Sequence, residues 1–240
     1  MSTVGSYRGP NIVTRGLVLH LDAASPNSYY APNGGTVWKD VSGNINNSTL
    51  LNEPLYEPDN SGRFYFDGTN DKVQTPIEYN TWHEHSWTVQ SWFSYNSVSR
   101  NNGFFEMTRQ NSSGNWGVST VPRNNELYFY WVGTSGAGHS FTSTEITSGN
   151  IINVTIAYRA VPGTPTQSEL YDATDTYING QPITHESNGG AGISSDGRLY
   201  VGSPTYHIQG DIYSFLYYEK ALSAQEVLQN YNATKDRFGL

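Results

Sequence analysis

Apolar and polar residues alternate with a period of two along most of the chain, which is the pattern of half-buried β-strands. In residues 16–22, for example, Leu17, Leu19 and Leu21 fall on one face. The same alternation recurs in segments 86–95, 126–132, 151–158, 198–203 and 211–218. Weaker forms of it occur in segments 103–109, 115–121, 139–146 and 176–180. About ten short strands separated by Gly, Asn and Pro are therefore expected, and such spacing is typical of a β-sandwich or jelly roll.

One α-helix is predicted, at residues 224–233. Ser223 suits the N-cap, and Glu226 completes an S-x-x-E capping box. Leu222 and Val227 hold the hydrophobic staple positions around this cap. Residues 1–15 show no clear pattern, so we expect an extended N-terminal arm followed by one domain at 16–240.

The composition supports an aromatic core with polar loops. The 240 residues include 18 Tyr, 9 Phe and 6 Trp, while charged residues make up only 14%, below the usual ~25%. A chain of this size can bury a core without disulfide bonds, and this one contains no cysteine.

Charge and hydropathy exclude several classes of partner. The formal net charge is −8, and the 13 Lys and Arg residues are spread along the chain, whereas nucleic-acid binding needs clustered positive charge. No apolar run approaches the ~18 residues of a membrane span. The N-terminus has no apolar signal-peptide core. We therefore expect a protein made and folded in a cytoplasm, with neither nucleic acid nor membrane as a partner.

The stretch FYFDGTNDKV, residues 64–73, contains the most conspicuous acidic pair, Asp67 and Asp71. The pair could form a metal or catalytic site, or it could turn the chain. Asp-Gly is a common turn dipeptide, and Asp accepts backbone N–H bonds at such corners. The sequence favours a hairpin corner.

Four distinctive segments follow one another along the chain. They are an opening strand that ends in Leu-Asp, the motif W-x-D-x-S-G-N, the motif F-x-F-D-G-x-x-D, and a closing strand with its ALS helix, found at 16–29, 37–56, 64–73 and 215–240. In this order they resemble the concanavalin A-like, laminin-G-type jelly-roll domain. The resemblance implies an all-β fold: a two-sheet antiparallel jelly-roll sandwich with a short C-terminal α-helix. More narrowly, the segments GPNIVTRGLVLHLDA and QNYNATKDRFGL are similar to structural proteins of tailed phages, especially those of cyanobacteria.

The narrower resemblance implies a non-enzymatic virion protein, such as a capsid decoration or fibre protein on the particle surface. Such a protein assembles in the host cytoplasm and contacts other virion proteins, further copies of itself and host-surface glycans. The alternative is a lectin-like carbohydrate-binding module for host attachment.

The family resemblance also implies one structural calcium ion near the two chain ends. Calcium takes six to eight oxygen ligands, and Asp22, Asp211 and the carbonyl of Gly62 are the implied ones. No contiguous calcium loop is present, so the alternative is that Asp22 and Asp211 only cap strand ends.

Glycoside hydrolysis is a third hypothesis, which needs two carboxylates about 5–9 Å apart. Glu106 stands alone in its segment, and Glu169, Asp172 and Asp175 have odd spacings that alternate faces in a regular strand. The sequence therefore favours a protein that is not an enzyme.

Four aromatic residues are candidates for stacking on sugar rings: Trp92, Trp116, Tyr130 and Tyr206. Trp92 and Tyr130 are expected on strand faces opposite the core, and the other two lie in or near loops. The alternative for each is packing in the core or against a neighbouring subunit, since aromatic residues are enriched at interfaces.

Overall fold

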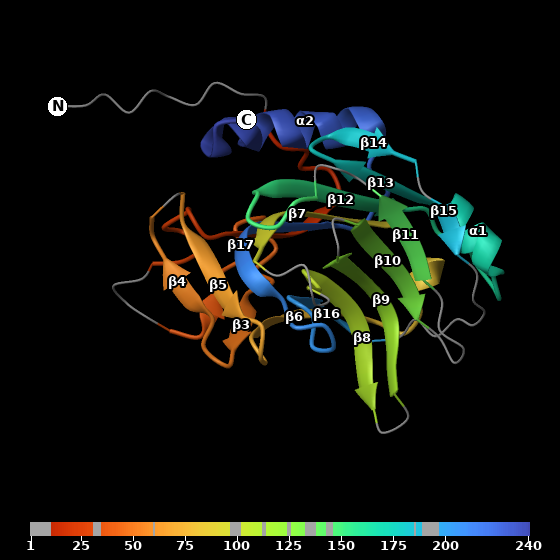
Figure 1. Ribbon diagram of the computed structural model, residues 1–240, viewed down its shortest axis with the longest axis horizontal. Coiled ribbons are helices and arrows are strands. Elements are labelled where there is room, and N and C mark those ends of the chain that lie inside the picture. The colour runs from red at the N-terminus through yellow and green to blue at the C-terminus, as the bar shows by residue number, and fades with distance from the viewer. Residues whose placement is uncertain are drawn as a thin grey trace.

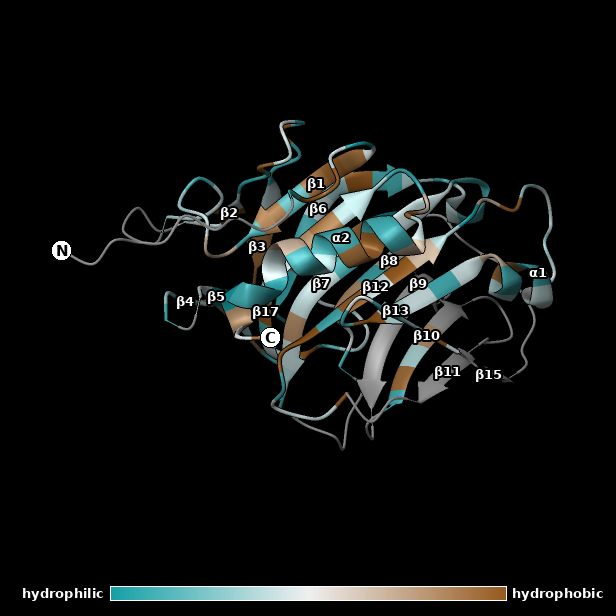
Figure 2. Cartoon of the chain, turned by 90° about the horizontal axis from the view of Figure 1, so that it is seen from above, coloured by the Kyte–Doolittle hydropathy of each residue, from teal (hydrophilic) through white to brown (hydrophobic). Residues whose placement is uncertain are grey.

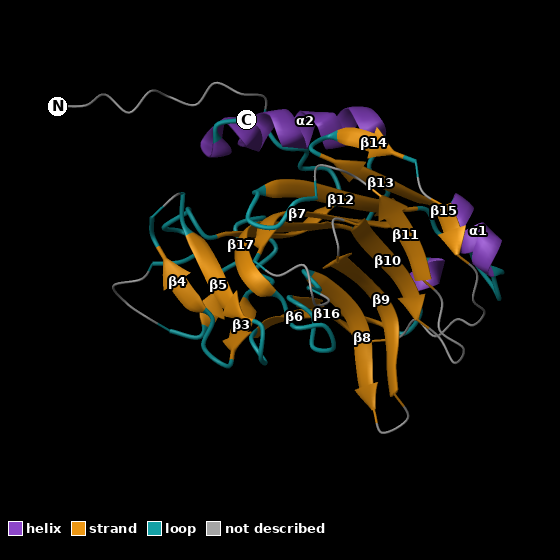
Figure 3. Cartoon of the chain, viewed as in Figure 1, coloured by secondary structure: helices purple, strands orange, loops and turns teal. Residues whose placement is uncertain are grey.

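The computed structural model describes residues 11–30, 35–59, 61–96, 102–111, 114–123, 126–132, 138–142, 146–184, 186–188 and 197–240. Their backbone forms two antiparallel sheets packed face to face, with one longer helix on an outer face (Figures 1 and 3). The predicted two-sheet sandwich with a short C-terminal helix is confirmed. Among the described residues, no helix is long and apolar enough to cross a membrane.

Sheet A has eight strands in the order β14-β13-β12-β7-β17-β5-β4, with β1 also paired to β17. Its strands are β1 (Leu17–Asp22), β4 (Leu55–Glu57), β5 (Arg63–Asp67), β7 (Trp87–Tyr95), β12 (Ile152–Tyr158), β13 (Thr174–Ile178), β14 (Gln181–Ile183) and β17 (Gln209–Tyr218). Strand β17 pairs along one side with β7 and along the other with β5 and then β1. The end of β1 and the start of β5 therefore meet beside the middle of β17.

Sheet B has nine strands in the order β15-β11-β10-β9-β8-β16-β6-β3-β2. Its strands are β2 (Val37–Trp38), β3 (Ser48–Leu51), β6 (Lys72–Tyr79), β8 (Phe105–Asn111), β9 (Gly114–Arg123), β10 (Glu126–Val132), β11 (Gly138–Thr142), β15 (Glu186–Asn188) and β16 (Gly197–Val201). The chain crosses from sheet B to sheet A between β3 and β4, where both sheets end in short edge strands.

The core between the sheets is aromatic, as the composition predicts. Phe93 and Phe104 stack with ring centroids 4.2 Å apart, and Trp38 packs on Phe64 at 4.6 Å. All four side chains are fully buried. Burial of each such side chain contributes about 1.5–3 kcal/mol, so this interior is the main source of stability.

Helix α2 (Ala224–Thr234) covers the outer face of sheet A (Figure 2). The predicted capping box is present, with the Ser223 hydroxyl accepting from the Glu226 amide and the Glu226 carboxylate accepting from the Ser223 amide. Val227 and Leu222 pack with Leu216 and Tyr218 of β17 into a second apolar cluster. The 3₁₀ turn η3 (Lys235–Phe238) continues the helix over the same face.

The described part of the predicted N-terminal arm contacts this helix. The Val13 amide donates to Asn230 Oδ1 at 2.7 Å, and the Tyr218 hydroxyl donates to the Val13 carbonyl at 3.0 Å. The Gln229 side chain donates to the Asn11 carbonyl at 2.7 Å. Residues 11–13 are therefore held against α2 by hydrogen bonds.

The segment around Glu169 differs from the strand geometry considered for it. A short helix, α1 (Gln167–Asp172), forms there and is capped by a second box, in which Thr166 and Glu169 exchange side-chain and backbone hydrogen bonds. The T-x-x-E spacing is the same signature that marks α2. Glu169 therefore serves as a helix cap. A further 3₁₀ turn, η2 (Trp82–Glu84), precedes β7.

Candidate functional site

Asp67 and Asp71 turn the chain between β5 and β6, as the sequence favours. Asp71 Oδ2 accepts from the Asp67 amide at 2.9 Å, and Asp67 Oδ1 accepts from the Thr69 amide at 2.7 Å. Gly68 between them has φ +81°. Asp71 is buried, and this burial raises the pKa of its carboxyl. Both acids are used by the hairpin corner itself.

The W-x-D-x-S-G-N motif is also structural. Asp40 Oδ1 accepts from the His20 amide at 2.9 Å and from the Ser42 amide at 2.8 Å, while Oδ2 accepts from the Asn46 amide at 2.9 Å. The side chain of Asn44 donates to the Leu17 carbonyl at 2.9 Å. The motif therefore fastens its loop to the edge of β1.

Two of the three implied calcium ligands come together, but around an arginine. Arg237 of η3 donates from Nη1 to Asp22 Oδ1 at 2.7 Å and from Nη2 to the Gly62 carbonyl at 3.1 Å. Asp211 lies nearby in β17 and pairs with Arg63, at 3.1 Å from Nε to Oδ1, and accepts from the Ser94 hydroxyl at 3.0 Å.

These residues do not fit a calcium ion as they stand. The oxygen atoms that would bind the metal already accept hydrogen bonds from two guanidinium groups, which carry their own positive charge. Within the described ranges, no cluster of three or more His, Asp or Glu side chains is arranged to hold a metal.

Glu106 of β8 is buried on the outer face of sheet B. Its carboxylate accepts from the hydroxyls of Ser203 and Thr205, the latter at 2.8 Å. Burial raises the pKa of Glu106, and these hydrogen bonds oppose the rise.

Trp92, one of the four aromatic residues predicted to stack on sugar rings, is covered by the C-terminal elements. Trp92 is 1% exposed, packs on Tyr231 and Phe238 with ring centroids at 5.6 and 4.4 Å, and donates from Nε1 to Thr234 Oγ1 at 2.9 Å. It does lie on the face opposite the core, as expected, but α2 and η3 cover that face. Trp92 therefore offers no ring surface to a sugar.

The other aromatic candidates lie on or beside sheet B. Tyr206 is half-buried next to Glu106, and burial raises the pKa of its hydroxyl. The side chains of Trp116 and Tyr130 lie outside the described part of the structure, although the backbone of Tyr130 pairs with Ser119 and that of Ser119 with Glu106.

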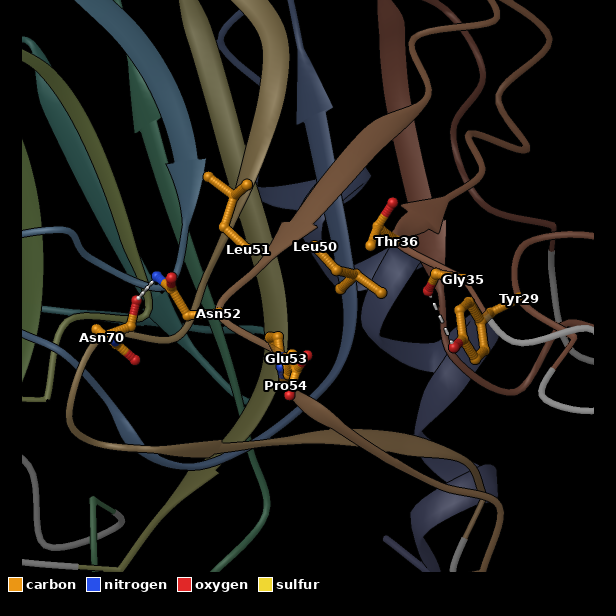
Figure 4. A pocket seen from close by; sticks show the side chains of 9 residues that line it. All are labelled: Tyr29, Gly35, Thr36, Leu50, Leu51, Asn52, Glu53, Pro54 and Asn70. Atoms are coloured by element: carbon orange, nitrogen blue, oxygen red, sulfur yellow. Dashed lines mark hydrogen bonds between the residues drawn. The ribbon is translucent and has the colours of Figure 1, made fainter.

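An open groove lies where the chain crosses from β3 to β4 (Figure 4). Its volume is about 830 Å³, within the range of ~300–1,000 Å³ usual for small-ligand sites. It is lined by Tyr29 with residues 35–36, by residues 50–54 and by the β5–β6 turn. The lining residues are Tyr29, Gly35, Thr36, Leu50, Leu51, Asn52, Glu53, Pro54 and Asn70.

Tyr29 provides the aromatic wall of this groove. Its ring packs on Tyr56 and Phe64, with both centroid distances 4.8 Å, and its hydroxyl donates to the Gly35 carbonyl at 3.3 Å. The half-buried ring is thus held rigidly by the core. Leu50 adds apolar surface beside it.

Two successive residues on the rim have left-handed backbones without being glycine. Asn52 has φ +65° and Glu53 has φ +67°. The left-handed region costs roughly 1–2 kcal/mol for an ordinary residue and less for Asn. The Asn52 side chain donates to the Asn70 carbonyl at 2.8 Å, which fixes this rim. Such strain tends to persist where function requires it.

Sequence reasoning missed the groove. The tripeptide Asn52-Glu53-Pro54 marks a loop, but nothing in it indicates two positive φ angles or a neighbouring tyrosine from residue 29. The sequence signal that could have pointed to this loop is the polar pair Asn52 and Glu53, which lies between an apolar strand and Pro54.

Comparison with solved structures identifies the same architecture in larger proteins. The binding domain of botulinum neurotoxin serotype D superposes with a TM-score of 0.63 at 14% identity, covering 91% of this chain and 52% of that one. Trypanosoma rangeli sialidase in complex with the inhibitor DANA gives 0.63 at 14%, covering 95% and 34%. The binding domain of Paraclostridial Mosquitocidal Protein 1 gives 0.61 at 16%, covering 91% and 52%. The chain thus spans about half or a third of these neighbours, and the likeness shows the fold alone.

Sequence comparison gives the family. A search of curated protein sequences returns no significant match. The family model described as the concanavalin A-like lectin/glucanases superfamily matches residues 67–228, which is more than half of the chain. The matched region runs from the Asp67 corner through the sandwich into α2. The chain therefore belongs to the concanavalin A-like lectin/glucanases superfamily.

Proposed function

We propose that this protein is a non-catalytic binding module whose ligand is a glycan held in the groove between β3 and β4. The observation that carries the proposal is the strained rim, in which Asn52 and Glu53 keep polar side chains at positions where glycine would be favoured. Opposite this rim stands the fixed ring of Tyr29. An aromatic wall that shares a groove with an amide and a carboxylate suits a ring that has one apolar face and several hydroxyls.

The ligand class follows from the charge of the groove. Glu53 is the acidic lining residue, and no lysine or arginine is among the described residues that line the groove. The whole chain carries a net charge of −8. An anionic sugar would meet repulsion here, so we expect a neutral glycan.

A binding role without hydrolysis is supported by the count of acids in the groove. Cleavage needs two carboxylates facing one another across the scissile bond. Glu53 is the one carboxylate among the described lining residues, and the neighbouring Asp71 is buried and bound to the Asp67 amide. A hydrolase is therefore the weakest of the candidate functions.

A second proposal concerns where the module works: as a decoration or fibre protein on the surface of a virion, assembled in the host cytoplasm. The exposed edge strands of the two sheets beside the groove favour this role. Edge strands β2 and β4 carry the exposed apolar residues Val37, at 45%, and Leu55, at 57%. Unpaired strand edges with apolar side chains are surfaces on which other chains dock. The partners would be other virion proteins or further copies of this chain.

A glycan array that compares neutral with sialylated oligosaccharides tests the binding proposal. Titration of a hit with Glu53→Ala and with the matched surface variant Glu78→Ala locates the site, because Glu78 lies on the outer face of sheet B. We expect Glu53→Ala to weaken binding at least tenfold and Glu78→Ala to leave it unchanged. An array without hits, or release of reducing sugar, would refute a glycan-binding, non-catalytic role. Mass spectrometry of purified particles tests the virion role.

A further inference from the structure

Three oxygen atoms from two distant parts of the chain converge on the guanidinium of Arg237. Asp22 Oδ1 accepts from Nη1 at 2.7 Å, the Gly62 carbonyl accepts from Nη2 at 3.1 Å, and the Ser61 carbonyl accepts from Nη2 as well. The contact is reciprocal, since the Ser61 hydroxyl donates to the Arg237 carbonyl at 3.0 Å. The Arg237 side chain of η3 thus binds both the end of β1 and the loop before β5.

The register of β17 explains why these groups meet. Asp22 pairs with Ser214 and Phe64 pairs with Ile212, so β1 and β5 follow one another along the same side of β17. The loop before β5 passes very close to β1 at Gly62. A Cβ on Gly62 would lie 2.7 Å from the Ala23 carbonyl oxygen, and φ there is +69°.

The converging atoms are those that a hard divalent cation would choose. A carboxylate oxygen and two backbone carbonyls are typical calcium ligands, and they usually surround the ion from several chain segments. In this protein the guanidinium of Arg237 occupies the position on which these oxygen atoms converge. Arg237 is mostly buried, with 16% of its side chain exposed, and Asp22 is 24% exposed.

We propose that Arg237 replaces a bound metal ion at the junction of β1, β5 and β17, and makes this joint independent of divalent cations. The guanidinium supplies the positive charge that the oxygen cluster needs. The adjacent Phe238 adds packing on Trp92, at 4.4 Å between ring centroids, and on Tyr213 at 5.2 Å. Removal of the arginine would leave an oxygen-lined position that can accept calcium.

Thermal melting of the full chain in chelator, calcium chloride and magnesium chloride tests this proposal. The wild type should melt at the same temperature in all three. Arg237→Ala should melt several degrees lower in chelator and recover part of that loss in calcium but not in magnesium. The matched control is Arg159→Ala, which removes an exposed pair with Asp175 and should show no calcium response.

Two outcomes would overturn the proposal. One is a chelator-induced drop in the wild-type melting temperature, which would mean that a metal is bound alongside the arginine. The other is a folded Arg237→Ala variant without any calcium response. If that variant does not fold, Arg237→Lys keeps a cation in place and should fold and ignore chelator; sensitivity of the lysine variant to chelator would refute the idea. A double variant, Arg237→Ala with Asp22→Asn, should lose the calcium rescue.

Discussion

Replacement of Glu53 by glycine should stabilise the fold while it abolishes glycan binding. The backbone of Glu53 has φ +67°, and the left-handed region costs roughly 1–2 kcal/mol for a residue with a Cβ. Glycine relieves that cost but loses about 0.5–1 kcal/mol more backbone entropy on folding. Glu53→Gly should therefore gain about 0.5–1 kcal/mol. Glu53→Ala keeps the strain and should leave stability nearly unchanged.

Urea denaturation of both variants measures the difference, and titration with an array hit measures binding. In a chain of this size, about 1 kcal/mol corresponds to a shift of about 2–4 °C in melting temperature. The control pair is Glu78→Gly and Glu78→Ala in the extended strand β6, where glycine should be the less stable of the two. The reasoning is refuted if glycine at position 53 is no more stable than alanine, or if either variant binds the glycan with wild-type affinity.

Three further perturbations have expected outcomes. Gly62→Ala should lower the free energy of unfolding, measured in urea, by about 2–3 kcal/mol, because overpacking and a positive φ act together. A loss no larger than that of an ordinary surface substitution would contradict the close approach. Ser223→Ala should cost about 1 kcal/mol by removing the α2 cap, whereas Ser223→Asp should restore it. The raised pKa of Glu106 means that the folded state binds this proton more tightly than the unfolded state. Its contribution to stability is present below its ordinary pKa of 4.5 and is lost as pH rises through the folded value, so Glu106→Gln should flatten that part of the stability profile.

The sandwich was predictable because its strands carry local signals. Period-two alternation in Leu17–Asp22 and Trp87–Tyr95 needs only the sequence, since burial on one face is what a strand in a sandwich requires. The Ser223 capping box is equally local, and it predicts the first residue of α2 correctly and the last to within one residue. The α1 box at Thr166 has the same form, but a strand geometry was considered for the acids beside it.

The site depended on contacts that no local pattern encodes. Trp92 alternates correctly with the core, yet α2 and η3 cover it. Asp22 and Gly62 do meet, but no local pattern indicates that Arg237, 215 residues from Asp22, binds both of them. Backbone angles such as φ +67° at Glu53 follow from the crossing between two sheets. Such features are set by the assembled fold.

The central place of β17 has a consequence for biogenesis. This strand is translated after every strand it joins, and among the described strands it is the one that links β7 to β5 and β1. Until residues 209–218 leave the ribosome, sheet A consists of three separate parts, β14-β13-β12-β7, β5-β4 and β1, whose strand edges facing β17 have unpaired backbone hydrogen-bonding groups. Such long-range closure slows folding and exposes the nascent protein to self-association. Production of this protein should therefore benefit from slow translation, low temperature or chaperones that shield these strand edges.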